Sequence, residues 1–332
     1  MKKVLSIVFL VVMVATMFVG CAKGAETTAA DAAETKDYSD ELYIGVYCLG
    51  DLEYFYDHKI GLAAAGKMMG VQTKYVGPPD YDIDAMVTAF EQAIAEEPAG
   101  IITFGAEVAL APVIDKAEAA GIPVITVDGD VSSSSRTAFV GTGNYAAGYL
   151  GGSKLAEALD GKGKVIVLTE PGVELHNDRA QGYQDALDEF SDIEVVQVGD
   201  TKADPVHTLQ IVAAMLQQYP DIDGIGCTDA VGGAASSTAV EEAGLAGKVK
   251  IISMDRDRQV LEKIGEDVIT GTIVQKSAMM PFYALQILFA MRHADVEIST
   301  DNSAAGITLA PNSIDTGVIY VDKSNAEFFI RD

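Results

Sequence analysis

Short, continuously apolar segments that alternate with longer stretches of helical period constrain this fold more than any other sequence feature. The apolar segments are rich in Val and Ile and are bounded by Gly, Pro, Asp or Asn. Continuous apolar character is typical of a parallel sheet covered on both faces, whereas a half-exposed strand alternates. The pattern therefore predicts a doubly wound α/β fold.

The expected elements follow directly from this alternation. The predicted strands are Leu42–Cys48, Gln72–Val76, Gly100–Phe104, Pro123–Val127, Val165–Thr169, Glu194–Val198, Gly224–Cys227, Lys250–Met254 and Val268–Val274. The predicted helices are Tyr54–Met69, Asp84–Glu96, Val108–Ala120, Tyr145–Leu159, Asp178–Phe190, Pro205–Tyr219, Val231–Glu242 and Met279–Arg292.

The chain also contains an internal repeat. The segment Pro123–Asp130, PVITVDGD, is similar to Lys250–Asp257, KIISMDRD. An earlier pair of apolar segments, Ala99–Thr103 and Asp223–Cys227, is similar as well. With 332 residues the chain is long enough for two domains, and the repeat predicts two halves built on one plan.

The N-terminal segment predicts export from the cytoplasm. Lys2 and Lys3 precede an apolar run that ends at Val19, which is short for a membrane span. The following Gly20-Cys21 resembles a bacterial lipobox, so we expect a signal peptide over residues 1–20 and a lipid on Cys21. An uncleaved anchor or simple secretion are the alternatives. Residues 21–40 are poor in large apolar side chains and predict a flexible tether.

Charge and cysteine content exclude several classes of function. The formal net charge is -26, from 23 basic and 49 acidic side chains, which opposes binding to nucleic acid. Besides Cys21 the chain has only Cys48 and Cys227, both inside apolar runs. We expect two separate buried thiols there and not a disulfide.

Polar and aromatic side chains follow the predicted strands at the edge where open α/β sheets bind ligands. They are Glu53, Tyr54, Phe55, Asp128, Asp130, Arg179, Asp229, Asp255 and Gln275. Carboxylates and Arg can bind hydroxyl groups, and an aromatic ring can cover the C–H face of a sugar, so a small neutral polyhydroxylated ligand fits this set. Two alternatives remain: each Asp can cap a helix, and the aromatic residues can belong to the core.

Signatures of enzymes and metal sites are mostly missing. The four His residues have no metal-ligand spacing, and no nucleophile or phosphate-loop motif occurs. Gly141–Ala146 matches G-x-G-x-x-A, but we interpret it as a domain crossover whose Asn144 caps the next helix. The acidic run Asp80–Glu91 imitates a calcium loop, and we interpret it as the N-terminus of a helix. We therefore expect no metal, no cofactor and no enzyme, although paired carboxylates leave a glycosidase as an alternative.

Several short motifs, taken in order, resemble those of the type I extracellular sugar-binding proteins of ABC transporters, the ribose- and galactose-binding group. The motifs are Gly121–Asp128, Gly161–Val165, Asp178-Arg179 with Gly182-Tyr183, Thr228-Asp229, Ser253–Asp255 and Thr272–Gln275. The resemblance implies two lobes joined by three crossovers. Lobe one would contain residues 41–142 and 276–305, and lobe two would contain residues 143–275 and 306–332.

The resemblance also implies roles for individual residues. Tyr54 and Phe55 match the aromatic pair that sandwiches the sugar, and Asp128 and Asp255 match carboxylates that bind its hydroxyls. Arg179 matches a donor to the sugar. Gln275 matches the amide at a crossover. This chain also departs from the family pattern. Thr228 replaces a usual Asn and leaves Asp229 as the polar contact, Glu53 replaces a Pro, and Asp130 adds a carboxylate.

The function implied is capture of a neutral monosaccharide or related polyol by a monomeric, lipid-anchored protein outside the cytoplasm. The sugar would then pass to an ABC permease. The alternative is a sensor of the same fold that reports a sugar or a furanose-like autoinducer to a membrane receptor. We do not expect a transcription regulator of this fold, because a signal peptide and an acidic tether are predicted where its DNA-binding helices would be.

Overall fold

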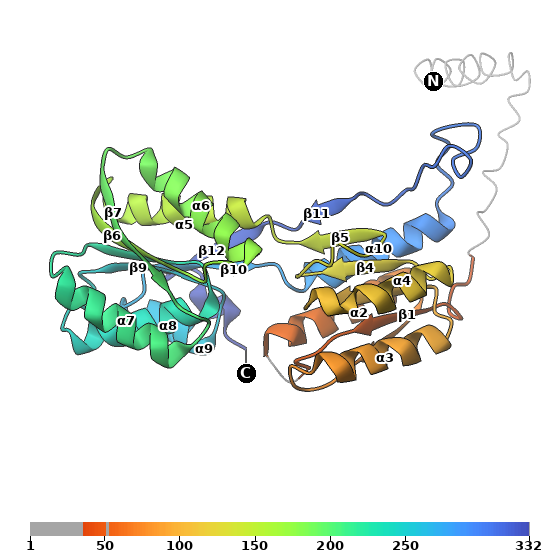
Figure 1. Ribbon diagram of the computed structural model, residues 1–332, viewed down its shortest axis with the longest axis horizontal. Coiled ribbons are helices and arrows are strands. Elements are labelled where there is room, and N and C mark those ends of the chain that lie inside the picture. Colours follow the sequence, from red (N-terminus) through yellow and green to blue (C-terminus); the bar gives the residue numbers. More distant parts are fainter. Residues whose placement is uncertain (1–35, 51–52, 332) are drawn as a thin grey trace, which may run out of the picture. The chain divides into compact units, whose positions relative to one another are not determined.

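The computed structural model describes residues 36–50 and 53–331 of the chain, and the described residues from Ser39 onward form one compact unit. The signal peptide, most of the tether and Cys21 lie outside the described residues. Two sheets organise this unit, each with six strands and each with helices on both faces (Figure 1). The doubly wound α/β prediction is confirmed.

The first sheet has the strand order β11-β5-β4-β3-β1-β2. Its strands are β1 (Leu42–Val46), β2 (Gln72–Val76), β3 (Gly100–Phe104), β4 (Val124–Val127), β5 (Ala138–Gly141) and β11 (Ser313–Asp315). One face packs against α2 (Glu53–Met69) and α10 (Met279–His293). The other packs against α3 (Ile83–Ala95) and α4 (Ala111–Ala119), which the short helix η1 (Val108–Leu110) precedes.

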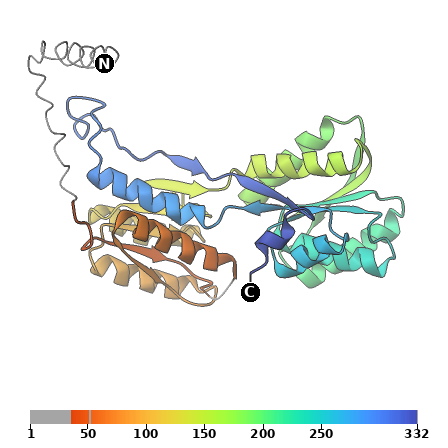
Figure 2. The ribbon, with the colours of Figure 1, turned by 180° about the vertical axis from the view of Figure 1, so that it is seen from behind.

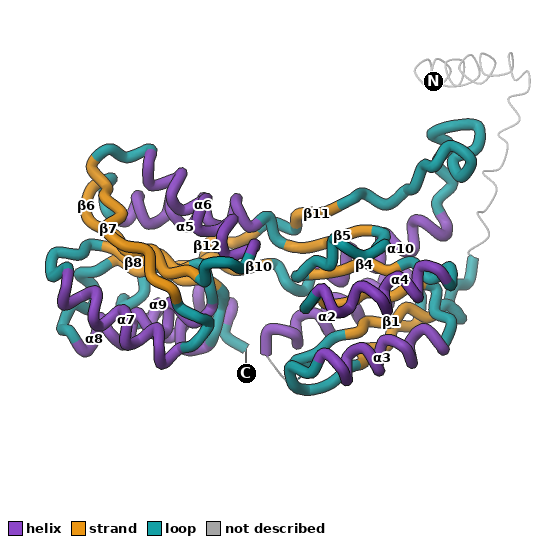
Figure 3. The backbone as a smooth tube through the Cα atoms, in the orientation of Figure 1, coloured by secondary structure: helices purple, strands orange, loops and turns teal. Residues whose placement is uncertain are grey.

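The second sheet has the order β12-β10-β9-β8-β6-β7. Its strands are β6 (Lys162–Thr169), β7 (Asp192–Asp200), β8 (Gly224–Cys227), β9 (Lys250–Met254), β10 (Gly271–Gln275) and β12 (Val318–Asp322). Helices α5 (Asn144–Ala158) and α6 (Glu174–Asp188) cover one face. Helices α7 (Pro205–Gln218), α8 (Ala230–Glu242) and α9 (Arg258–Gly265), with η2 (Ala326–Phe329), cover the other, as Figure 3 shows.

The two sheets repeat one topology. Strands β1 to β5 lie in the order 2-1-3-4-5, and β6 to β10 lie in the equivalent order, all pairing in parallel. The repeated sequence segments form β4 and β9, which occupy the same place in their sheets. The sheets differ in their last strand, because β11 is parallel to β5 whereas β12 is antiparallel to β10.

The third crossover lies later in the chain than the sequence indicated. The resemblance places residues 306–332 in lobe two, but Ser313–Asp315 pairs with β5 of the first sheet. The chain therefore crosses between Asp315 and Val318 (Figure 2). A strand of three residues is too short for its hydrophobic pattern to reveal it. The helix α9 was also not predicted, although Val260, Leu261 and Ile264 give its eight residues a clear apolar face.

A buried ion pair joins the two lobes. Asp57 of α2 accepts hydrogen bonds from Arg256 Nη2 at 2.7 Å and from Ser277 Oγ at 2.9 Å, and it also pairs with Arg331. Burial raises the pKa of Asp57, but hydrogen bonds from Arg256, Ser277 and Arg331 hold the pKa below its usual value. Asp57 is therefore charged at neutral pH and links α2 to the loop after β9.

Close contact between α5 and α6 places the start of α5 beside Arg179. A Cβ atom on Gly148 of α5 would lie 1.9 Å from the carbonyl oxygen of Arg179 in α6. A Cβ on Gly182 of α6 would lie 2.2 Å from the carbonyl oxygen of Tyr145. Two glycines thus allow the two helix backbones to touch.

We expect Gly148→Ala to lower the free energy of unfolding by about 3 kcal/mol, because the new methyl group forces the helices apart. The change would ordinarily stabilise a helix interior. Gly265→Ala, at the end of α9 with no atom within 4 Å of the added methyl, is the matched control and should be neutral or stabilising. Urea denaturation measures both variants, and equal stabilities would contradict the packing argument.

Candidate functional site

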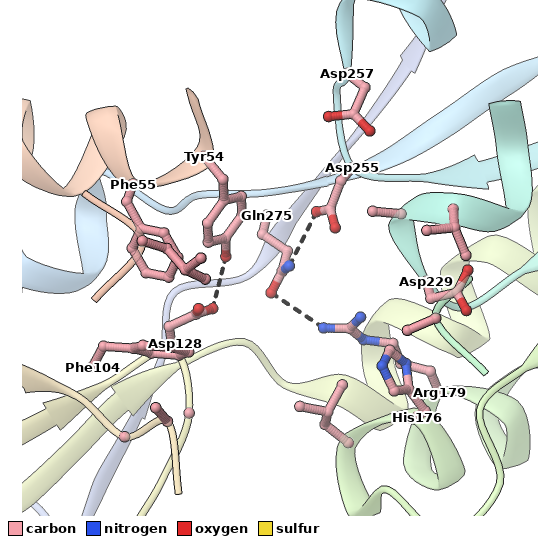
Figure 4. A pocket seen from close by; sticks show the side chains of 18 residues that line it. Tyr54, Phe55, Phe104, Asp128, His176, Arg179, Asp229, Asp255, Asp257 and Gln275 are labelled. Atoms are coloured by element: carbon pink, nitrogen blue, oxygen red, sulfur yellow. Dashed lines mark hydrogen bonds between the residues drawn. The ribbon is translucent and has the colours of Figure 1, made fainter. Parts of the chain in front are cut away.

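A cavity of about 610 Å³ lies between the lobes, at the carboxyl ends of the strands of both sheets (Figure 4). This is the edge at which open parallel sheets bind ligands. Its polar and aromatic lining residues are Tyr54, Phe55, Phe104, Asp128, His176, Arg179, Asp229, Asp255, Asp257 and Gln275. The volume is within the range of small-molecule sites.

Aromatic side chains of the first lobe form one wall of the cavity. Tyr54 and Phe55 lie in the first turn of α2, and Phe104 ends β3. The Phe55 and Phe104 ring centroids are 4.9 Å apart, and those of Tyr54 and Phe55 are 5.3 Å apart, edge to face. The sequence singled out Tyr54 and Phe55 but missed Phe104, whose position at a strand end was the available signal.

Asp128 and Asp255 occupy equivalent positions in the two repeats, directly after β4 and β9. Both have a left-handed backbone, with φ of 67° and 65°. Most side chains avoid this conformation, but Asp tolerates it comparatively well. The repeat found in the sequence therefore places one carboxylate from each lobe at the cavity, in the same backbone geometry.

Burial makes both carboxylates difficult to ionise. Tyr54 Oη donates to Asp128 Oδ1 at 2.7 Å. Burial, supported by the charge of Asp255, raises the pKa of Asp128 to about 6 against the lowering influence of Tyr54 and Arg179. Burial also raises the pKa of Asp255, opposed by Arg179 and Gln275.

Arg179 is a buried cation at the second-lobe side of the cavity. Its Nε donates to Asn144 Oδ1 at 2.9 Å, its Nη1 to the Thr228 carbonyl at 3.0 Å, and its Nη2 to Gln275 Oε1 at 3.2 Å. The Gln275 amide in turn donates from Nε2 to Asp255 Oδ1 at 3.0 Å. This chain of hydrogen bonds connects three of the residues that the sequence singled out (Figure 4).

Asp229 lines the cavity and also caps a helix. Its Oδ1 accepts from the Gly232 backbone N–H at 2.9 Å at the start of α8, and its Oδ2 accepts from Thr201. The capping alternative raised by the sequence therefore holds for this residue. Burial raises its pKa above the usual value, opposed first by the hydrogen bond from Thr201.

Two further lining residues were not found from the sequence. His176 lies in α6, three positions before Arg179, and burial together with the Arg179 charge lowers its pKa to about 4, so its ring is neutral at pH 7. Asp257 follows Asp255 in the loop after β9. The one signal in the sequence for His176 and Asp257 was that each lies within three residues of a predicted site residue, Arg179 or Asp255.

The structure places Asp130 outside this cavity. Its carboxylate pairs with Arg136 and accepts from Thr126 Oγ1 at 2.8 Å, and it borders a neighbouring cavity of about 430 Å³. Arg136, which neutralises Asp130, lies six residues later in the chain. The position of Asp130 after a strand does not reveal this partner. Glu53 begins α2, but its side chain lies outside the described residues.

Two other sequence motifs have structural interpretations. Residues 141–146 cross from β5 to α5 as expected, but Gly143, not Asn144, is the N-cap residue of α5. Asn144 fails as a cap because its side-chain oxygen accepts from Arg179 instead. In the acidic run, Asp82 caps α3 by accepting from the Ala85 N–H, as expected for a helix N-terminus.

Cys48 and Cys227 are buried free thiols, as predicted. Within residues 36–50 and 53–331, no three His, Cys, Asp or Glu side chains group as metal ligands. No helix in this part of the chain has the length and apolar character to cross a bilayer.

Comparison with known proteins identifies the family. A family model described as a periplasmic binding protein domain matches residues 44–294. The chain belongs to the periplasmic binding protein family. The structure of AraP, an arabinose-binding protein from Geobacillus stearothermophilus, is 33% identical with a TM-score of 0.83, over 88% of this chain and 100% of that chain.

Two further proteins are similar to this chain. A sugar-binding protein of a sugar ABC transporter from Bacillus halodurans is 33% identical with a TM-score of 0.82, over 88% of this chain and 100% of that chain. The D-apiose import binding protein of Paraburkholderia graminis is 26% identical over 230 residues, 67% of this chain and 72% of that protein. The resemblance to sugar-binding proteins of ABC transporters and the type I fold are confirmed.

Membership also decides between the broad classes of function. Periplasmic binding proteins are extracytoplasmic and are not enzymes, so the prediction of a non-enzymatic protein is confirmed and the glycosidase alternative is removed. The carboxylates at the cavity therefore belong to a binding protein of the family.

We expect Asp128→Asn to stabilise the ligand-free protein at pH 7, because the pKa of this carboxylate is about 6 in the folded protein and 3.8 in the unfolded chain, so ionisation favours unfolding. Asn keeps an oxygen that can accept from Tyr54 and has no charge. The free energy of unfolding of Asp128→Asn minus that of the wild type should increase by about 1–3 kcal/mol from about pH 4 to pH 7. Above pH 7 this difference should stay constant. Urea denaturation across this range measures it, and a gain that shrinks with rising pH would contradict the argument.

Proposed function

We propose that the protein is an extracytoplasmic lipoprotein that captures one monosaccharide or related polyol between its lobes and delivers it to an ABC importer. The observation that carries the proposal is that both lobes line one cavity. Lobe one contributes aromatic rings, and lobe two contributes Arg179, Asp255 and Gln275. A ligand that contacts both walls binds the closed arrangement of lobes best and so drives closure.

The chemistry of the lining favours a neutral polyhydroxylated ring. Among the described residues, three of the five N–H groups of Arg179 donate to protein acceptors, which leaves two for ligand hydroxyls or a ring oxygen. Asp128 and Asp255 accept from hydroxyl groups when ionised. Tyr54, Phe55 and Phe104 offer rings to the C–H face of a sugar. AraP is an arabinose-binding protein and another relative is an import binding protein for D-apiose, which supports testing pentoses first.

An acidic or phosphorylated sugar fits this cavity poorly. Asp128, Asp229, Asp255 and Asp257 line it, whereas Arg179 is the one Lys or Arg among the lining residues that the structure describes. An anionic ligand would meet more negative than positive side chains at close range. We therefore propose that selection works against anionic sugars.

Thermal unfolding of the chain without residues 1–20, against pentoses, hexoses, deoxysugars, inositols and amino acids, tests the function. We expect one neutral monosaccharide or polyol to raise the melting temperature, since a ligand that binds only the folded state stabilises it by mass action. Arg179→Ala should weaken that binding by more than ~100-fold, because ligand hydroxyls lose a charged donor and the carboxylates of Asp128 and Asp255 lose a nearby positive charge.

Arg136→Ala is the matched control, because Arg136 pairs with Asp130 outside the cavity and should leave the affinity unchanged. If no sugar or polyol shifts the melting temperature after co-purified ligand has been removed, the import function is overturned. A shift only with a furanose-like signal molecule would favour the sensor of the same fold.

Lipid attachment at Cys21 generates a separate prediction for the full-length chain expressed in a bacterium. Wild-type protein should partition into detergent and carry a lipid mass at its N-terminus, whereas Cys21→Ser should be released in a water-soluble form. Cys48→Ser is the control, because that thiol is buried in lobe one and should leave partitioning unchanged. Detergent partition of the Cys21→Ser protein identical to wild type would contradict lipidation at this residue.

A further inference from the structure

Two polar side chains hydrogen-bond to Arg179 and Gln275, which line the cavity. Both of these side chains line the adjoining cavity of about 430 Å³, which shares Asp128 with the first. Asn144 is the first residue of α5, and Thr142 lies two positions earlier, on the crossover that follows β5. The lining of the 610 Å³ cavity includes Arg179 and Gln275 but neither Asn144 nor Thr142. Both nevertheless make direct hydrogen bonds to those two lining residues.

Asn144 fixes the plane of the Arg179 guanidinium. A guanidinium is planar, so its orientation is set once Nε and one terminal nitrogen have acceptors. The Nε–H donates to Asn144 Oδ1 at 2.9 Å and Nη1 donates to the Thr228 carbonyl at 3.0 Å. Arg179 is only 5% exposed, so water cannot easily replace a lost acceptor.

Thr142 fixes the orientation of the Gln275 amide. Thr142 Oγ1 donates to Gln275 Oε1 at 2.8 Å, and Arg179 Nη2 donates to the same oxygen at 3.2 Å. With Oε1 held by two donors, the Nε2 of Gln275 faces Asp255 and donates to its Oδ1 at 3.0 Å. The crossover after β5, which contains Thr142, is therefore hydrogen-bonded to the crossover after β10, which begins at Gln275. The shared acceptor is Gln275 Oε1, which also accepts from Arg179.

We propose that Asn144 and Thr142 are positioning residues that set the ligand-binding geometry of Arg179 and Gln275. The inference rests on the proposed function, because it assigns these two crossover residues to the same site. We expect their effect on ligand affinity to pass through the guanidinium and the amide, and the double-mutant cycle below separates this route from direct contact with a ligand in the adjoining cavity.

A double-mutant cycle tests whether Asn144 acts through Arg179. Asn144→Leu, of similar size, should weaken binding of arabinose, or of the sugar that the thermal panel selects, by about 10- to 100-fold, the typical effect of losing a hydrogen bond to a charged group. In the Arg179→Lys background the same change should alter affinity by less than about twofold, since lysine has no Nε–H in that position. Asn144→Asp retains an acceptor oxygen and should restore much of the affinity.

A second measurement needs no ligand. The Arg179 Nε–H resonance, assigned in a ¹⁵N spectrum by its absence from Arg179→Lys, should exchange slowly with water in the wild type and rapidly in Asn144→Leu. Thr142→Val should weaken binding and Thr142→Ser should restore it. Thr316→Val is the control, because Thr316 Oγ1 bonds the Gly141 carbonyl at the third crossover and touches neither Arg179 nor Gln275.

Equal losses of affinity for Asn144→Leu in both backgrounds, or an unchanged Nε–H exchange rate, would overturn the positioning role. A loss in Thr316→Val as large as in Thr142→Val would also overturn it, since any crossover change would then suffice. If wild-type protein binds no sugar, the proposed function fails, whereas the exchange measurement still decides whether Asn144 holds Arg179.

Discussion

The buried guanidinium of Arg179 is the constraint on which the site depends. A charge removed from water must be compensated by hydrogen bonds, or the folded state loses several kcal/mol. Its three protein acceptors are neutral oxygens, one each from the start of α5, the loop after β8 and the end of β10. Three segments that are distant in sequence must therefore meet at one point, which requires the close helix contact at Gly148.

Neutral acceptors leave the positive charge of Arg179 effective across the cavity. Arg179 lowers the pKa of Asp128 and of Asp255, although burial keeps both pKa values above the usual one. Neither carboxylate forms a salt bridge with it among the described residues. Within residues 36–50 and 53–331, the remaining N–H groups of Arg179 do not pair with these carboxylates, so both are available to a ligand placed between them.

The two lobes contribute through the repeat and through the bridge between them. Asp128 and Asp255 follow equivalent strands with the same left-handed backbone, so each lobe places one acceptor at the cavity. Asp57, one turn after Tyr54 on α2, pairs with Arg256, the residue after Asp255. The helix that bears the aromatic wall is therefore tied to the loop that bears the second-lobe carboxylate.

The sequence by itself determined the doubly wound fold, the internal repeat and most strand-end residues of the site, because apolar periodicity and position after a strand are local properties. It did not reveal that Ser313–Asp315 joins the first sheet, since three residues carry no periodicity. Tertiary structure decided which strand-end groups serve the cavity. Asp130 is neutralised by Arg136, and Asn144 supports Arg179 and not its own helix, because the partner of a polar side chain is set by packing between distant segments.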